Sequence, residues 1–339
     1  MAMNAPMNAV ELRERINTAR ATHYSGNFAE ALAMLRALTP ELPGVGDLAL
    51  AAECHLWASH VEVRLGNLSE ALHAATLASL LARRAARPDI EGKALTELAM
   101  HDYFCGYPDR GAALAGQSIE RLGADGEPLW LEYGWMALAE NLLMQGDYDA
   151  ARVAAQHAVI QGIRSGADEN EGDSTDPQGA MGTVALAWVD ALTGHALRGA
   201  ERCQALTHTE GRLTLAPYCG GYEGYCWLEH GDAARALPLL QTALASIRSW
   251  GFKPVAALFA AWVADAQRQL GLEAQCRASL DLSSELCGVH PHAMARGWRL
   301  RTEALLASGA ERAQRLDEAA LAFRLVGAMH EAARTLEKL

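Results

Sequence analysis

Apolar and small side chains recur along this chain three and four residues apart, which is the spacing of one face of an α-helix. The stretch 135–159 shows the pattern most clearly. Apolar residues at helical spacing over 135–142 are followed by a polar turn, and small and apolar residues return over 150–159. Gly146 supplies the left-handed backbone conformation that ends a helix at low cost, and Asp147 is suited to cap the next helix. The segment therefore predicts two antiparallel helices joined by a tight turn.

Similar turns recur at nearly even intervals of 40, 40, 40, 48, 37, 40 and 38 residues. A period of this size is typical of a solenoid, in which one helical unit is stacked repeatedly. Valine and isoleucine are sparse and do not alternate with polar residues, so no strand pattern competes. The sequence predicts an all-α solenoid of about eight antiparallel helix pairs. In the last unit we expect the second helix to begin near Gln314 and a final helix to cover 329–338. The turn glycines are Gly26, Gly66, Gly106, Gly146, Gly194, Gly231, Gly271 and Gly309.

The fourth unit resembles the tetratricopeptide repeat family. That family has a large residue early in the first helix, a small one in mid-helix, Gly-Asp-Tyr at the turn and Ala in the second helix. The resemblance implies a right-handed superhelix whose first helices line the inner surface. The period of about 40 residues exceeds the family's 34. It is similar to the extended repeats in the sensor domains of large LuxR-type bacterial regulators, such as the maltose-regulon activator, whose nucleotide-binding and DNA-binding domains have no counterpart in this sequence. The matching residues are Trp135, Ala139, Gly146, Asp147, Tyr148 and Ala151.

The array is expected to form a single domain over residues 1–339. The 48-residue interval contains an acidic insertion at 167–177, which is either a solvated loop or a lid or contact arm over the groove. The insertion does not fit an EF-hand, because glycine is not at loop position six and no glutamate follows at position twelve. The expected units are 11–50, 51–90, 91–128, 129–166, 178–214, 215–253, 254–291 and 292–339.

Composition narrows the classes of function. The formal net charge is −12 and no basic run occurs, so direct nucleic-acid binding is not expected. No apolar run is long enough to span a membrane, and the first residues lack the pattern of a secretory signal. The seven cysteines are scattered without a CxxC pair, which favours a reduced, cytoplasmic protein. Abundant alanine and the excess of arginine over lysine are associated with GC-rich bacterial genomes.

The motifs of common enzyme classes are absent from the sequence. Gly92-Lys93 is followed by Ala94, so there is no Walker A loop, and neither G-x-S-x-G nor HExxH occurs. Cys287, His290 and His292 are close enough in sequence to suggest a metal site, but Pro291 separates the histidines and no second cluster completes a ligand shell. We therefore expect no metal, no cofactor and no catalytic residue set.

A ligand is expected on the concave face, because first helices line it in tetratricopeptide repeats. By analogy with that family, the position six residues before each turn glycine faces the groove, together with some neighbouring positions. Aromatic rings mixed with carboxylates suit a basic or amphipathic peptide, a sugar or a small amphiphile. The set lacks the Lys/Asn clamp that binds C-terminal carboxylates in chaperone-binding repeats. Aromatic residues at these positions are equally suited to packing. The candidate binding residues are Arg20, His60, Tyr103, Tyr133, Glu140, Trp188, Tyr222, Tyr225, Trp262 and Asp265.

Three functions remain open on this sequence. The first is a non-catalytic scaffold, an adaptor or regulatory protein that holds a peptide, protein segment or small effector in its groove. The second is a stand-alone small-molecule sensor domain of a transcriptional regulator. The third is an enzyme in which Glu140 or Asp265 works beside a tyrosine of the groove. A protein or peptide, or a small amphiphilic effector, is the expected partner, and the first unit is the candidate edge for a homodimer.

Overall fold

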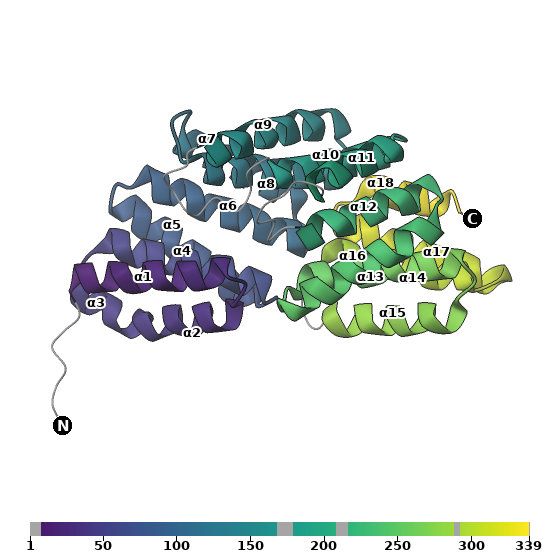
Figure 1. Ribbon diagram of the computed structural model, residues 1–339, viewed down its shortest axis with the longest axis horizontal. Helices are drawn as coiled ribbons and strands as arrows, with labels where there is room; N and C mark the ends of the chain where they lie inside the picture. The colour runs from purple at the N-terminus through teal and green to yellow at the C-terminus, as the bar shows by residue number, and fades with distance from the viewer. Residues whose placement is uncertain (1–7, 168–178, 208–215, 288–291, 339) are drawn as a thin grey trace, which may run out of the picture.

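The chain folds into helices that pack as consecutive antiparallel pairs, a tetratricopeptide-like helical solenoid (Figure 1). The computed structural model describes residues 8–167, 179–207, 216–287 and 292–338, and in those ranges every regular element is a helix. The elements are α1 Ala9–Tyr24, α2 Phe28–Leu38, the 3-10 turn η1 Thr39–Glu41, α3 Leu42–Val45, α4 Leu48–Arg64, α5 Leu68–Arg84, α6 Pro88–Cys105, α7 Pro108–Leu122, α8 Pro128–Gln145, α9 Tyr148–Ala167, α10 Ala180–Leu192, α11 Ala196–Thr207, α12 Ala216–His230, α13 Ala233–Ser249, α14 Lys253–Gln269, α15 Glu273–Cys287, α16 Ala293–Leu306, α17 Gly309–Leu325 and α18 Met329–Leu336.

The predicted turn chemistry is confirmed where the pattern is clearest. Gly146 has a φ of 81°, and the amide of Asp147 donates back to the carbonyl of Leu142 over 3.0 Å. The carboxylate of Asp147 accepts from the amide of Ala150 at 3.1 Å, which caps α9. Glycine is favoured here because only it enters the left-handed region without a side-chain penalty.

The expected start of the last second helix was wrong. Helix α17 begins at Gly309, directly after Ser308, and not near Gln314. The residues between are Ala, Glu, Arg and Ala, which are strong helix formers, so nothing in them delays the helix. The short elements η1 and α3, between α2 and α4, were not expected.

First helices lie inside the curve and second helices lie outside it. Each first helix, from α1 through α4, α6, α8, α10, α12 and α14 to α16, packs against the next first helix as well as against its own partner. The burial pattern agrees, because α14 is buried along almost its whole length whereas α15 buries only Cys276, Leu280 and Ser283. The hydrophobic core therefore follows the inner side of the superhelix.

The curve closes on itself. Helix α6 contacts α16, and α8 contacts α18, so the purple-to-blue units at the left of Figure 1 meet the green-to-yellow units at the right. We call this contact the seam. A Cβ atom built on Gly106 would lie 2.5 Å from the Cβ of Val326, which shows how closely the two segments approach. The other turn glycines of the seam and their neighbours are Gly26 with Trp250, Gly66 with Lys253 and Pro254, and Gly146 with His330.

Glycines within helices also allow close approach. A Cβ on Gly221 would lie 2.2 Å from the ring of Phe259, and one on Gly224 would lie 2.7 Å from Leu240. The glycine-rich segment of α12 is therefore explained by close helix packing, which outweighs the low helix propensity of glycine.

Buried acids near the ends of first helices hold second helices in place. Asp190 of α10 is fully buried and accepts from Arg152, Arg198 and Arg202, which come from α9 and α11. Three hydrogen-bonded arginines lower the pKa of Asp190 although burial opposes that change. The acid thereby ties its own unit to the preceding one.

Substituting a turn glycine with alanine tests the seam. Gly106→Ala is expected to lower the unfolding free energy by about 2–4 kcal/mol, because a left-handed conformation and an overlap with Val326 are both penalised. Gly231→Ala is the matched control, since Gly231 has a φ of 92° but no neighbour within 4 Å of the added Cβ. It should lose only about 1–2 kcal/mol. Urea unfolding of both variants measures the difference, and equal losses would show that Gly106 does not face the C-terminal units.

Candidate functional site

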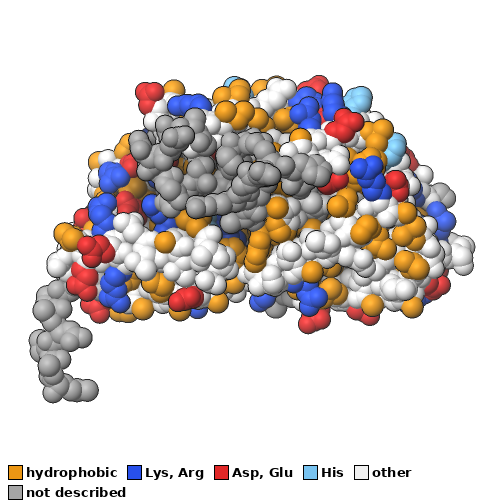
Figure 2. Space-filling view, in the orientation of Figure 1, with side chains coloured by type: hydrophobic (Ala, Val, Ile, Leu, Met, Phe, Trp, Pro, Cys, Tyr) orange, Lys and Arg blue, Asp and Glu red, His pale blue; other side chains and the backbone are white. Residues whose placement is uncertain are grey.

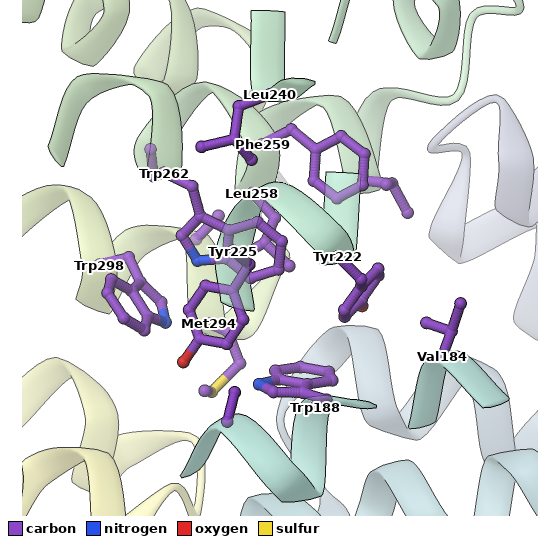
Figure 3. Close-up of a cluster of buried hydrophobic side chains, with 14 of the residues drawn as sticks. Val184, Trp188, Tyr222, Tyr225, Leu240, Leu258, Phe259, Trp262, Met294 and Trp298 are labelled. Carbon is purple, nitrogen blue, oxygen red and sulfur yellow. The ribbon is translucent and has the colours of Figure 1, made fainter. Parts of the chain in front are cut away.

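Four of the sequence-predicted binding residues meet in one aromatic cluster, shown in Figure 3. Trp188 of α10, Tyr222 and Tyr225 of α12 and Trp262 of α14 are each no more than 1% exposed. The rings of Tyr225 and Trp262 stack at 4.4 Å, and Trp188 meets Tyr222 at 5.3 Å. Because the superhelix is tightly closed, these side chains fill the inside of the curve and do not line an open groove.

A buried acid lies beside this cluster among tyrosines. Glu140 of α8 is 2% exposed, and its Oε1 accepts from the hydroxyl of Tyr218 at 3.5 Å. Burial raises the pKa of Glu140 to about 8. It also raises the pKa of Tyr103 well above its usual value, and the charge of Glu140 adds to that effect. Glu140 therefore favours its protonated, neutral form in the folded chain.

A cavity of about 170 Å³ lies between the N-terminal units and the segment joining α13 to α14. We call it the central cavity. Its walls come from α1, α4, α6, α8, α10 and α12 and from the residues that end α13 and begin α14. Most of its lining is apolar, which is typical of ligand pockets. The apolar and aromatic lining residues are Tyr24, Phe28, Val63, Met100, Phe104, Tyr133, Met136, Met181, Tyr218, Ile247, Trp250 and Phe252.

Three groups with ring or carboxyl heads give the cavity its polar side. His60 Nδ1 lies 2.6 Å from Glu97 Oε1, and both residues are buried. Burial raises the pKa of Glu97 to about 7 and lowers that of His60 well below its ordinary value. The pKa of His23 is lowered in the same way, first by burial and then by Arg64. Both imidazoles are therefore neutral at neutral pH, and His60 Nε2 and His23 Nδ1 have no hydrogen-bond partner among the described groups.

Arg64 is the cation of this cavity. It is half-buried at the last position of α4, and its Nη1 donates to the carbonyl of His60 at 2.8 Å. Most other acids near the first helices are paired with arginines, as Glu62 is with Arg36. In the part of the chain that the structure describes, Arg64 forms no salt bridge with a carboxylate.

The remaining predicted residues are dispersed. His60 and Tyr133 line the central cavity. Arg20 lines a different, polar cavity of about 220 Å³, with its guanidinium carbon 5.8 Å from the ring centroid of Trp57. Asp265 lies near the end of α14 and accepts from Arg268 and Gln269. Glu140 and Asp265 have separate partners, so they do not form a carboxylate pair.

Several lining residues were not predicted, and Trp250 is the clearest case. Trp250 follows a second helix, whereas the prediction considered only first helices. Its ring reaches the cavity because the seam brings it beside Gly26. Glu97 was also missed, although its position one turn before Met100 and Tyr103 on α6 indicates the inner face.

The histidine expected in a metal-like cluster has a packing and capping role. His292 Nδ1 accepts from the amide of Met294 at 3.2 Å and so caps α16. Its ring is buried edge-on against Tyr103, and burial lowers its pKa to about 3. The neighbouring His290 lies outside the described residues, as does nearly all of the acidic insertion. No group of three or more potential metal ligands occurs among the residues with a described placement.

The surface gives no single dominant charge. On the face shown in Figure 2, Lys and Arg side chains are interspersed with Asp and Glu wherever side chains are described. None of the helices, over the ranges described, is long and apolar enough to cross a membrane.

Comparison with known proteins shows the fold. The sequence matches no family model and no curated protein. A solved structure of a Rap protein complexed with competence and sporulation factor is similar over 98% of this chain and 97% of that one, with a TM-score of 0.63 and 14% identity. The Cut9–Hcn1 hetero-tetramer of the APC/C is matched over 97% of this chain and 90% of that chain, with a TM-score of 0.37 and 15% identity. The fold is thus a tetratricopeptide-like repeat, and the narrower resemblance to LuxR-type sensor domains stays a prediction.

Replacing the buried acid with its amide tests the interior electrostatics. The raised pKa of Glu140 means that the folded chain holds a proton that the unfolded chain releases above its usual pKa of about 4.5. Stability therefore falls as pH rises from about 4.5 to about 8. The amide side chain carries no such proton, so the stability of Glu140→Gln relative to wild type should grow by roughly 2–4 kcal/mol between pH 5 and pH 8. Unfolding curves at both pH values measure this change, and a pH-independent difference would contradict it.

Proposed function

We propose that this chain is a non-catalytic binding scaffold, an adaptor or regulatory protein whose central cavity holds a small effector or one anchor side chain of a peptide. The observation that carries the proposal is the central cavity itself. It is unfilled space inside an otherwise tightly packed interior, and buried polar atoms without partners border it. Native interiors leave few such spaces and few such atoms.

The volume of the cavity supports a small occupant. An engineered cavity of about 150 Å³ accepts benzene, and pockets for drug-sized ligands occupy about 300–1,000 Å³. The central cavity, at about 170 Å³, is of the first size. An extended peptide along the whole inner face is not supported, because aromatic side chains fill the curve between α10 and α16.

The comparison with the Rap protein supports a binding role. That protein was solved as a complex with competence and sporulation factor, and its fold matches this chain from end to end. A superhelix of this length is thus compatible with holding a partner. The small cavity favours an effector that this chain senses, which is also the role expected for a stand-alone sensor domain.

Filling the cavity tests the proposed function. Purified protein would be screened by thermal shift against a library of small organic acids, amides and capped five-residue peptides. A ligand that binds the native state at 100 times its Kd adds about 2.7 kcal/mol of stability. Met100→Trp places a larger, half-buried ring at the cavity wall and should weaken such a ligand at least tenfold by calorimetry.

Met329→Trp is the control for this experiment, because Met329 is 56% exposed on α18 and does not line the cavity. It should bind as wild type does. A library without stabilising members, or members that bind the Met100→Trp variant with unchanged affinity, would contradict the proposed site.

A further inference from the structure

The charge of Arg64 restricts which effector the central cavity accepts. This inference rests on the proposed function and names the ligand class of the same site. Arg64 is half-buried at the cavity wall, and its contact within the described chain is the carbonyl of His60. A guanidinium carries five donors and is always protonated. Donors held in a partly desolvated wall, with no carboxylate bound, favour an anionic partner.

The other polar groups of the cavity do not supply that anion. Glu97 is occupied by its 2.6 Å contact with His60 and favours its neutral form because it is buried. His23 and His60 are neutral for the same reason. Arg64 therefore sets the charge of the site, and a cationic ligand would meet it unfavourably.

The two unpartnered imidazole nitrogens add a second point of recognition. The rings of His23 and His60 lie 4.9 Å apart, and both residues line the cavity. His60 Nε2 and His23 Nδ1 are buried without a hydrogen-bond partner among the described groups. A polar atom of a ligand placed near Arg64 would satisfy buried groups that otherwise cost free energy.

We propose that the central cavity binds a small carboxylic acid whose carboxylate pairs with Arg64 and whose apolar body, of about six to ten non-hydrogen atoms, packs against Met100, Met136 and Trp250. A free acid is the occupant that fits, because a peptide chain exceeds the volume of about 170 Å³. Methionine side chains are adaptable and suit an aromatic or branched body.

Calorimetry with matched probes tests this inference. The probes are 3-phenylpropionate, its uncharged isostere 3-phenylpropionamide, and the tripeptide N-acetyl-Ala-Ala-Phe, which carries the same carboxylate on a longer chain. We expect wild type to bind 3-phenylpropionate at least tenfold more tightly than the amide, because a charged hydrogen bond is lost with the amide. The tripeptide should bind more weakly than the free acid.

Removing the cation should erase the preference for the acid. Arg64→Gln is expected to bind the acid and the amide with equal affinity, and its affinity for the amide should match that of wild type, which shows that the cavity is intact. Arg64→Lys should restore part of the preference. The control is Arg84→Gln, because Arg84 is exposed on α5 and lies outside the cavity. If Arg64→Gln does not fold, the comparison of the acid with the amide on wild type decides alone.

The outcomes separate this inference from the proposed function. Equal binding of acid and amide by wild type, tighter binding of the tripeptide, or a preference for the acid that survives in Arg64→Gln would overturn the carboxylate assignment. If neither probe binds but a library member does, and Met100→Trp weakens it, the carboxylate assignment fails while the cavity remains the site. If no ligand is sensitive to Met100→Trp, both fail.

Discussion

The contact between the first turns and the last units governs the rest of this structure. An open solenoid has an accessible inner face, but here α6 packs on α16 and α8 on α18. The turn glycines serve two purposes at once, because they end first helices and also present bare backbone to the opposite units. Gly106 against Val326 is the closest example. Without side chains at these turns, the two halves approach closely enough to share one core.

Closure converts what would be a groove into core. The rings of Trp188, Tyr222, Tyr225 and Trp262 come from three helices and pack against one another with almost no exposed surface. Aromatic rings bury large areas and favour stacked or edge-on contacts, both of which occur here. The part of the interior that stays unfilled is bordered by the shorter first unit and by Trp250. Polar side chains gather there, so the site is defined by where packing is incomplete.

Much of the fold could be predicted from the sequence, because it depends on local features. The glycine period, the small residues after each turn and the helical spacing of apolar positions all act within one unit. The closure could not be predicted, since it depends on contacts between residues more than 200 positions apart, such as Gly106 and Val326. For the same reason the prediction placed His60 and Tyr133 at the cavity but missed Trp250, which no single repeat reveals. The turn at Gly309 was misplaced because the glycine there opens a helix.

A double-mutant cycle between the two sides of the seam measures the closure most directly. Gly106→Ala and Val326→Gly would be studied alone and together by urea unfolding. If the segments touch, removing the Val326 side chain relieves the overlap caused by the new Cβ, and the double variant should recover about 1 kcal/mol relative to the sum of the single losses. Strictly additive losses would show that the two residues are apart. The curve would then be open, and the enclosed cavity described here would not exist in solution.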